Sequence, residues 1–174
     1  IQDIQARSQQ IDAFIQERLN QEQAQPEPMV DEKTLLRRLY LDLIGRIPSI
    51  EETTAYVGSE DLRKRERLID SLLSSEGHVS HEFNHWADLL RIKSRMRNLP
   101  GQPYIEWVRD AFRENLSYDQ FVSQLINAKG YLWEDGATGF YFRDAGMELD
   151  HMANTFQVFL GTQVGCAQCH DHPY

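Results

Sequence analysis

The spacing of the apolar residues is the feature that most constrains the fold of this chain. Along most of its length these residues return every three or four positions, which is the period of a helix with one buried face. The pattern predicts helices over residues 1–19, 31–43, 49–57, 61–73, 83–92, 104–112, 118–126 and 147–160. We therefore expect an all-α fold, an irregular multi-helix bundle of about eight helices.

Capping residues support several of these boundaries. Asp31 is placed to cap the second predicted helix, and Gly45 is placed to end it. Ser49 and Glu52 have the spacing of a capping box, in which each side chain accepts a hydrogen bond from the other residue's backbone N–H. Gly58 follows soon afterwards, so the third helix is predicted to be short.

One segment, residues 129–146, departs from the helical period. It holds four glycines, Trp133 and the run Phe140-Tyr141-Phe142. Clustered glycines favour turns, so we predict an ordered loop or a small hairpin directly before the last helix. The aromatic residues either wall a pocket or pin the loop to the core. We favour the second role, because large aromatic rings contribute mainly to packing.

Composition and charge limit the class of protein. The chain has 174 residues, of which 41% are hydrophobic and 26% charged, as in a globular domain, and we expect one domain spanning residues 1–174. No stretch approaches the roughly 18 consecutive apolar residues of a membrane span. The net charge of −9 repels phosphate backbones, so nucleic acid is not an expected partner. A cationic protein partner suits this charge better.

The two cysteines of the chain lie in a single motif. They occur in the run Cys166-Ala167-Gln168-Cys169-His170, so a framework of dispersed disulfides is excluded. Two thiols at this spacing can reach the two vinyl groups of a haem, and the imidazole that follows them is a common ligand of haem iron. The motif therefore predicts one covalently attached haem c, held by Cys166 and Cys169, with His170 as the proximal iron ligand.

Two other uses of these thiols remain open. Cys166 and Cys169 could form part of a structural zinc site with His170 or His172, but such a site usually needs a second pair of ligands. A dithiol redox pair expects a strand that leads into a helix. The sequence shows neither context, so we favour haem.

A second metal motif precedes the cysteines. The run His81-Glu82-Phe83-Asn84-His85 matches His-Glu-x-x-His, in which two imidazoles on one helix bind zinc and the glutamate activates water. A hydrolase of that type has a strand-backed cleft and a third ligand, and no such strand is predicted. Because Phe83 and Trp86 mark the buried face, we expect His85 to be a core or haem-facing residue and His81 to be exposed.

Longer blocks of sequence carry a family resemblance. The cysteine motif continues to Tyr174 as Cys-Ala-Gln-Cys-His-Asp-His-Pro-Tyr and follows Val158-Phe159-Leu160-Gly161, while residues 37–48 read Arg-Arg-Leu-Tyr-Leu-Asp-Leu-Ile-Gly-Arg-Ile-Pro. Further blocks follow in order at 68–75, 85–88, 107–112 and 118–122. Together, over residues 11–174, they resemble the planctomycete-type cytochrome c domain family, second type, long described as a domain of unknown function.

The resemblance implies a compartment and a context. Members of that family are domains of large exported bacterial proteins, so the expected location is periplasmic or otherwise extracytoplasmic, where haem is attached covalently. Their polypeptides continue beyond the haem segment, and residues 1–174 are then expected to be a fragment of a longer multidomain protein. The expected partners are a redox protein or further domains of the same polypeptide.

The function predicted from these features is electron transfer by a monohaem domain, rather than catalysis by an enzyme on its own. The sixth iron ligand stays open among Met152, Met147, Met96 and His85, and His172 is expected in a supporting role beside the haem. A zinc-binding protein and a helical interaction module without metal are the alternatives.

Overall fold

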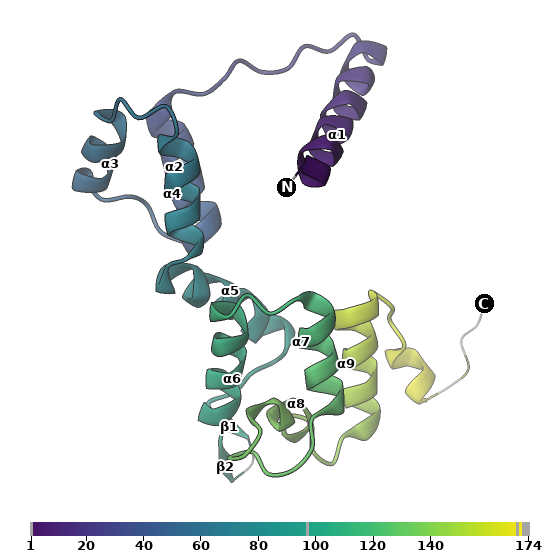
Figure 1. Cartoon of the computed structure of the whole chain (residues 1–174). Helices are drawn as coiled ribbons and strands as arrows, with labels where there is room; N and C mark the ends of the chain where they lie inside the picture. Colours follow the sequence, from purple (N-terminus) through teal and green to yellow (C-terminus); the bar gives the residue numbers. More distant parts are fainter. Residues whose placement is uncertain (1, 97, 170, 172–174) are drawn as a thin grey trace. The chain divides into compact units, whose positions relative to one another are not determined.

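The structure is a computed structural model that describes residues 2–96, 98–169 and 171 (Figure 1). Its α-helices are α1 (Gln2–Gln21), α2 (Glu32–Ile44), α3 (Ile50–Val57), α4 (Lys64–Leu73), α5 (Glu76–Leu89), α6 (Gln102–Arg113), α7 (Tyr118–Asn127), α8 (Gly139–Phe142) and α9 (Glu148–Leu160). Two 3₁₀ helices, η1 (Gly136–Thr138) and η2 (Gly165–Gln168), complete the helical part. The predicted all-α class is confirmed, and the eight predicted helices correspond to all of these α-helices except α8.

A single small hairpin interrupts the helices in the described residues. Strands β1 (Arg95–Met96) and β2 (Leu99–Pro100) pair antiparallel, with Arg95 opposite Pro100 and Met96 opposite Leu99. The hairpin was not predicted, because two-residue strands are too short to show an alternating pattern.

The chain divides into two compact units, residues 1–35 and 36–174. In the first unit, α1 leaves Ile4, Ile11 and Phe14 exposed. Asp31 caps the start of α2 as predicted, since its Oδ1 accepts the backbone N–H groups of Lys33 and Thr34 at 2.9 and 3.0 Å. No helix in the described part of the chain combines the length and the apolar character that a membrane span requires.

The predicted capping box opens α3. Ser49 Oγ accepts the Glu52 N–H, and Glu52 Oε2 accepts the Ser49 N–H at 2.7 Å. The guanidinium of Arg46 donates to both carboxylate oxygens of Glu52, at 2.7 and 2.8 Å. These hydrogen bonds favour the ionised carboxylate and lower its pKa to about 2. Arg46 therefore ties the end of α2 to the start of α3.

Two hydrophobic clusters stabilise the second unit. The smaller one joins α2, α3 and α4 through the buried residues Leu36, Tyr40, Tyr56 and Leu72. The larger one joins α5, the hairpin, α6, α7, the following loop and α8 through Phe83, Leu90, Met96, Tyr104, Val108, Ala111, Phe121, Leu125, Leu132, Ala137 and Phe140. The partly buried Val158 and Phe159 add α9 to this larger cluster.

The glycine-rich segment 129–146 folds as a loop that carries η1 and α8, not as a hairpin. Gly136 and Gly139 explain why it packs so closely on α6. A Cβ on Gly136 would lie 2.4 Å from the Pro103 carbonyl oxygen, and one on Gly139 would lie 2.4 Å from Tyr104 Cβ. Side chains there would force the segment away from α6.

Helix α5 begins earlier than predicted. Its N-cap is Ser75, whose Oγ accepts the His78 N–H at 3.2 Å, so the helix starts seven positions before the expected residue 83. The sequence pattern did not predict the first turn of α5, because Gly77 lies in it and glycine has a low helix propensity. In the structure a Cβ at Gly77 would lie 3.3 Å from Ile44 Cβ, so glycine allows close contact between the two helices.

Replacing Leu125 by alanine is expected to destabilise the protein by about 2–5 kcal/mol, because this fully buried side chain lies in the larger cluster. Urea unfolding followed by circular dichroism measures the change. Leu62→Ala is the matched control: Leu62 is fully exposed, so its loss is expected to change stability by less than about 0.5 kcal/mol. Equal losses from the two substitutions would contradict the assigned core.

Replacing Glu52 by glutamine tests the Arg46–Glu52 pair, because glutamine preserves the capping box and removes the charge. The pKa of Glu52 is lowered from 4.5 to about 2 on folding, so its charge stabilises the native state above pH 4.5. We expect the stability advantage of the natural chain over Glu52→Gln to fall as the pH decreases from 4.5 to about 2. Urea unfolding across this range measures it, and a difference independent of pH would contradict the pairing.

Candidate functional site

The two cysteines lie on one tight turn that follows α9. Cys166 belongs to η2 and Cys169 follows it directly, with the Cys169 N–H donating to the Cys166 carbonyl oxygen at 3.2 Å. Both side chains are exposed, and both thiols are free. The predicted ligand His170 and the predicted supporting residue His172 lie outside the described residues.

The cysteine turn is held against α9. Gln168 Nε2 donates to Asp150 Oδ1 at 3.3 Å, and other residues of η2 also contact this helix. Asp150 belongs to the first turn of α9, and Figure 1 shows η2 beside this helix in yellow. The chain thus folds back after α9 and brings the cysteine motif close to the start of the helix.

Helix α9 carries an apolar face that is exposed. Leu149, Met152, Phe156 and Leu160 are spaced by three, four and four positions, so they lie on one side of the helix. Their exposed fractions are 54, 46, 38 and 65%, and none of the 13 residues of α9 is fully buried. Exposed apolar side chains gathered on one helix face are a feature of binding surfaces.

The structure separates the predicted candidates for a sixth ligand. Met96 is 2% exposed and is enclosed in the larger hydrophobic cluster. His85 is exposed on α5, with its ring edge-on to Trp86 at 6.4 Å between centroids. Met147 occupies the N-cap position directly before α9, and Met152 lies on the exposed face of that helix, which also holds the contact to the cysteine turn.

The structure corrects part of the prediction for the His-Glu-x-x-His motif, because His85 is not a core residue and His81 is not exposed. His85 is exposed and not a core residue, because the buried face of α5 runs through Val79 and Phe83. His81 is partly buried and lies against Gly45, where an added Cβ would come within 2.5 Å of His81 Nδ1. Across the described residues no three His, Cys, Asp or Glu side chains gather closely enough to hold a metal ion.

A buried charged cluster was not predicted from the sequence. Arg143 and Asp144, at the end of α8, have side chains only 1% exposed, and Arg143 Nε lies 3.0 Å from Asp144 Oδ2. Arg91 lies 3.5 Å from the other carboxylate oxygen. His151, from α9, places Nδ1 3.5 Å from Asp144 Oδ2, and Arg143 also donates to the Leu90 carbonyl oxygen.

Burial governs the ionisation of this cluster. Burial lowers the pKa of His151, and the nearby positive charge of Arg143 lowers it further. The imidazole is therefore neutral near pH 7. Burial also lowers the pKa of Arg143 and raises that of Tyr104, whose hydroxyl has no hydrogen-bond partner among the described residues. The adjacent charges of Arg143 and Asp144 beside an aromatic run were the one sequence signal that could have revealed the cluster.

A pocket of about 410 Å³ opens beside the buried charges. It is lined by Tyr141, Phe142, Asp144, Ala145, Gly146, Glu148 and His151. The His151 ring packs against both Phe140 and Tyr141, with ring centroids 4.7 and 4.9 Å away. Both roles considered for the aromatic segment therefore occur, since the buried Phe140 pins it to the core while Tyr141 and Phe142 wall this pocket.

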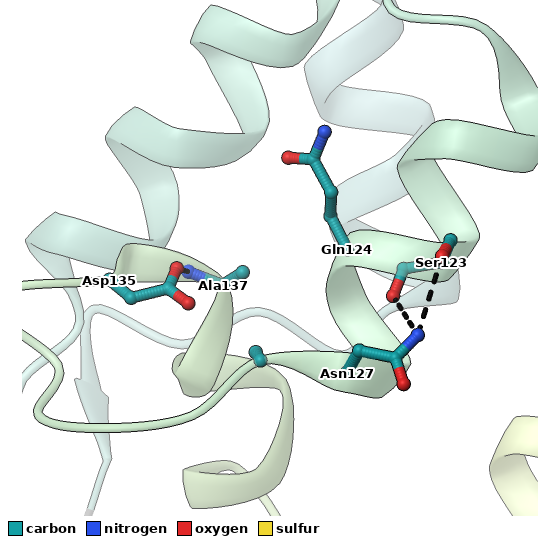
Figure 2. Close-up of a pocket in the computed structure, with 6 residues that line it drawn as sticks. Ser123, Gln124, Asn127, Asp135 and Ala137 are labelled. Atoms are coloured by element: carbon teal, nitrogen blue, oxygen red, sulfur yellow. Dashed lines mark hydrogen bonds between the residues drawn. The ribbon is translucent and has the colours of Figure 1, made fainter.

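A polar pocket of about 270 Å³ lies between α7 and the loop before η1 (Figure 2). Asn127 Nδ2 donates to the Ser123 carbonyl oxygen at 2.8 Å, and Asp135 Oδ1 accepts the Ala137 N–H at 3.0 Å. The first contact stabilises the end of α7, and the second caps the start of η1. The side chains that line the pocket include no thiol or imidazole that could bind a redox metal.

Tyr104→Phe is expected to leave the protein as stable as before or to stabilise it by about 1–3 kcal/mol, because it removes a buried hydroxyl without a partner. Urea unfolding measures the effect. Tyr40→Phe is the matched control, since Tyr40 is also buried but its hydroxyl contacts Glu52, and it should cost about 0.5–1.5 kcal/mol. A larger loss at Tyr104 than at Tyr40 would show that its hydroxyl is bonded.

Comparison with known proteins gives a family without an assigned activity. No curated protein and no solved structure matches the chain significantly. The model of the PSCyt2 family, described as a protein of unknown function (DUF1549), matches residues 10–174. The match begins within one residue of the resemblance found in the sequence blocks and includes both cysteines. The chain therefore belongs to the PSCyt2 (DUF1549) family.

Proposed function

We propose that this chain is a c-type monohaem electron-transfer domain. Cys166 and Cys169 would hold the haem through thioether bonds, and His170 would ligate its iron. Each thiol adds across one vinyl group, with sulfur bonding to one carbon and the proton going to the other, so that attachment needs no oxidant. The bound haem would supply one-electron redox chemistry at the iron.

The observation that carries this proposal is the state of the cysteine turn. Covalent attachment requires two thiols that are reduced, accessible and close together in the chain. Cys166 and Cys169 are both free and exposed, and a backbone hydrogen bond of 3.2 Å joins them across one turn. A buried or disulfide-bonded pair would have argued against haem, and the donor set present here fits the group.

The surroundings of the turn suit a large apolar ligand. The porphyrin is flat and mostly apolar, so its binding needs apolar protein surface close to the anchoring cysteines. The exposed face of α9, from Leu149 to Leu160, is such a surface, and the Gln168–Asp150 hydrogen bond holds the cysteine turn to the same helix. Burial of this face under a ligand would also account for a helix without a fully buried residue.

Zinc fits the described residues less well. Structural zinc sites use four ligands, and only Cys166 and Cys169 gather in the described part of the turn. The pair His81 and His85 has no third His, Cys, Asp or Glu beside it in the same part of the chain. Haem needs only the two thiols and one imidazole that the motif itself contains.

The proposed setting follows from the chemistry. Covalent attachment of haem would place the domain outside the cytoplasm, in the periplasm or another exported location, as the family resemblance implies. The net charge of −9 favours a cationic region on the redox partner, whether that partner is a separate protein or another domain of the same polypeptide.

Expression in a host that attaches c-type haem tests the proposal. The purified chain is expected to gain the mass of one haem, which stays bound after denaturation, and to give a pyridine haemochrome spectrum. Cys166→Ser combined with Cys169→Ser is expected to abolish the covalent mass, because no thiol remains to form a thioether. Each single serine variant should retain at most one thioether and shift the haemochrome band.

The control for folding is the circular dichroism of the double serine variant, which should match the natural chain because both cysteines are exposed. Leu62→Ala, at a fully exposed position and made in the same host, should keep the haem. A fully matured natural chain without haem, whose two thiols both react with an alkylating reagent, would refute the proposal. Stoichiometric zinc in that sample would favour the structural metal site instead.

A further inference from the structure

Two exposed aromatic rings in the loop after α7 have no role in the proposed haem site. Tyr131 and Trp133 are 59 and 68% exposed, and their rings stack with centroids 4.7 Å apart and planes only 8° from parallel. Exposing large apolar rings to water costs free energy, which burial under a ligand would recover. The pair is therefore a candidate binding surface.

The loop fixes the position of these rings. Leu132, between them, is 3% exposed and belongs to the larger hydrophobic cluster. The Tyr131 carbonyl oxygen accepts the N–H groups of both Glu134 and Asp135 at 2.9 Å, so the backbone on each side of Trp133 is anchored. A ring held in this way loses little conformational entropy when a ligand binds.

One face of Trp133 stays open to a ligand. Stacking on Tyr131 covers one face of the indole, and the side chain nevertheless keeps two thirds of its surface exposed. The opposite face must therefore be in contact with solvent. Tyr131 supports the indole from behind and limits its rotation.

The polar pocket of about 270 Å³ adjoins this loop. Ala128 before the rings and Asp135 after them both line it, and Figure 2 shows Gln124 on α7 and Asp135 on the loop at two sides of the pocket. The Gln124 amide has no hydrogen-bond partner among the described residues, and Asp135 uses only Oδ1, which accepts the Ala137 N–H. The amide can donate and accept, and the second carboxylate oxygen can accept, so both suit the hydroxyl groups of a ligand.

A ligand that fits both features needs a flat apolar face and a polar edge. A pyranose sugar has both, because the C–H groups on one face of its ring carry partial positive charge and pack against the negative face of an indole, while its hydroxyl groups point outward. Glu134, Asp135 and the net charge of −9 repel acidic or sulfated sugars. They also repel the phosphates of a nucleic acid, whose bases could otherwise stack here.

We propose that Trp133 and the adjacent polar pocket bind a neutral glycan, an uncharged polymer or oligomer of pyranose sugars. Trp133 stacks on one sugar ring, Tyr131 supports the indole, and Gln124 and Asp135 form hydrogen bonds with the hydroxyl groups. The site includes no residue of the cysteine turn, so it does not depend on the haem function.

Native gel electrophoresis of the full chain through gels that contain a polysaccharide tests this proposal. We expect at least one of galactomannan, arabinoxylan and mixed-linkage β-glucan to retard the natural chain, and dextran sulfate to leave its mobility unchanged. Trp133→Ala should weaken the binding by about tenfold. Gln124→Ala should weaken it by about threefold, because one hydrogen bond is lost. Phe14→Ala, which removes a ring 69% exposed on α1, is the matched control and should bind as before.

Circular dichroism checks that each variant is folded, as expected for side chains that lie at the surface. The proposal is overturned if none of the three neutral polysaccharides retards the chain, if dextran sulfate retards it more than they do, or if Trp133→Ala binds like the natural chain. A dimer that depends on Trp133, found by analytical ultracentrifugation without glycan binding, would assign the rings to a protein interface instead. If Trp133→Ala does not fold, Gln124→Ala decides, and unchanged binding by that variant rejects the site.

Discussion

The close packing of residues 129–146 on α6 is the constraint on which the rest of the second unit depends. Gly136 and Gly139 lie so near Pro103 and Tyr104 that any side chain would clash. This contact buries Phe140 and brings α8 into the larger cluster. The direction in which the chain leaves α8, and thus the start of α9, follows from it.

The same contact creates the buried charges. Once α8 is packed against the core, Arg143 and Asp144 at its end cannot reach solvent, and they must pair with each other and with Arg91 and Leu90. Ion pairs of this kind contribute little net stability, since the cost of desolvation offsets the attraction. They fix the position of the Asp144 carboxylate, one oxygen of which lies 3.5 Å from His151 Nδ1.

The cysteine turn is organised by weaker forces than the core. Gln168 and Asp150 form one exposed hydrogen bond, and the apolar side chains of α9 beside it remain open to solvent. Exposing such an apolar surface to water costs free energy, and covering it lowers the free energy of the protein. The proposed haem would supply that cover and would link the turn to the first turn of α9, so that the cofactor and the fold would stabilise each other.

The sequence by itself determined the helical class, the caps at Asp31 and Ser49, the family blocks and the cysteine motif. These features are local, because a helical period, a cap and a motif each depend on residues a few positions apart. Only the tertiary structure decided that Met96 is enclosed, that His85 is exposed, and that Asp144 meets His151. Those outcomes depend on which helix faces are covered by distant segments, and no local pattern encodes the close approach that Gly136 and Gly139 permit.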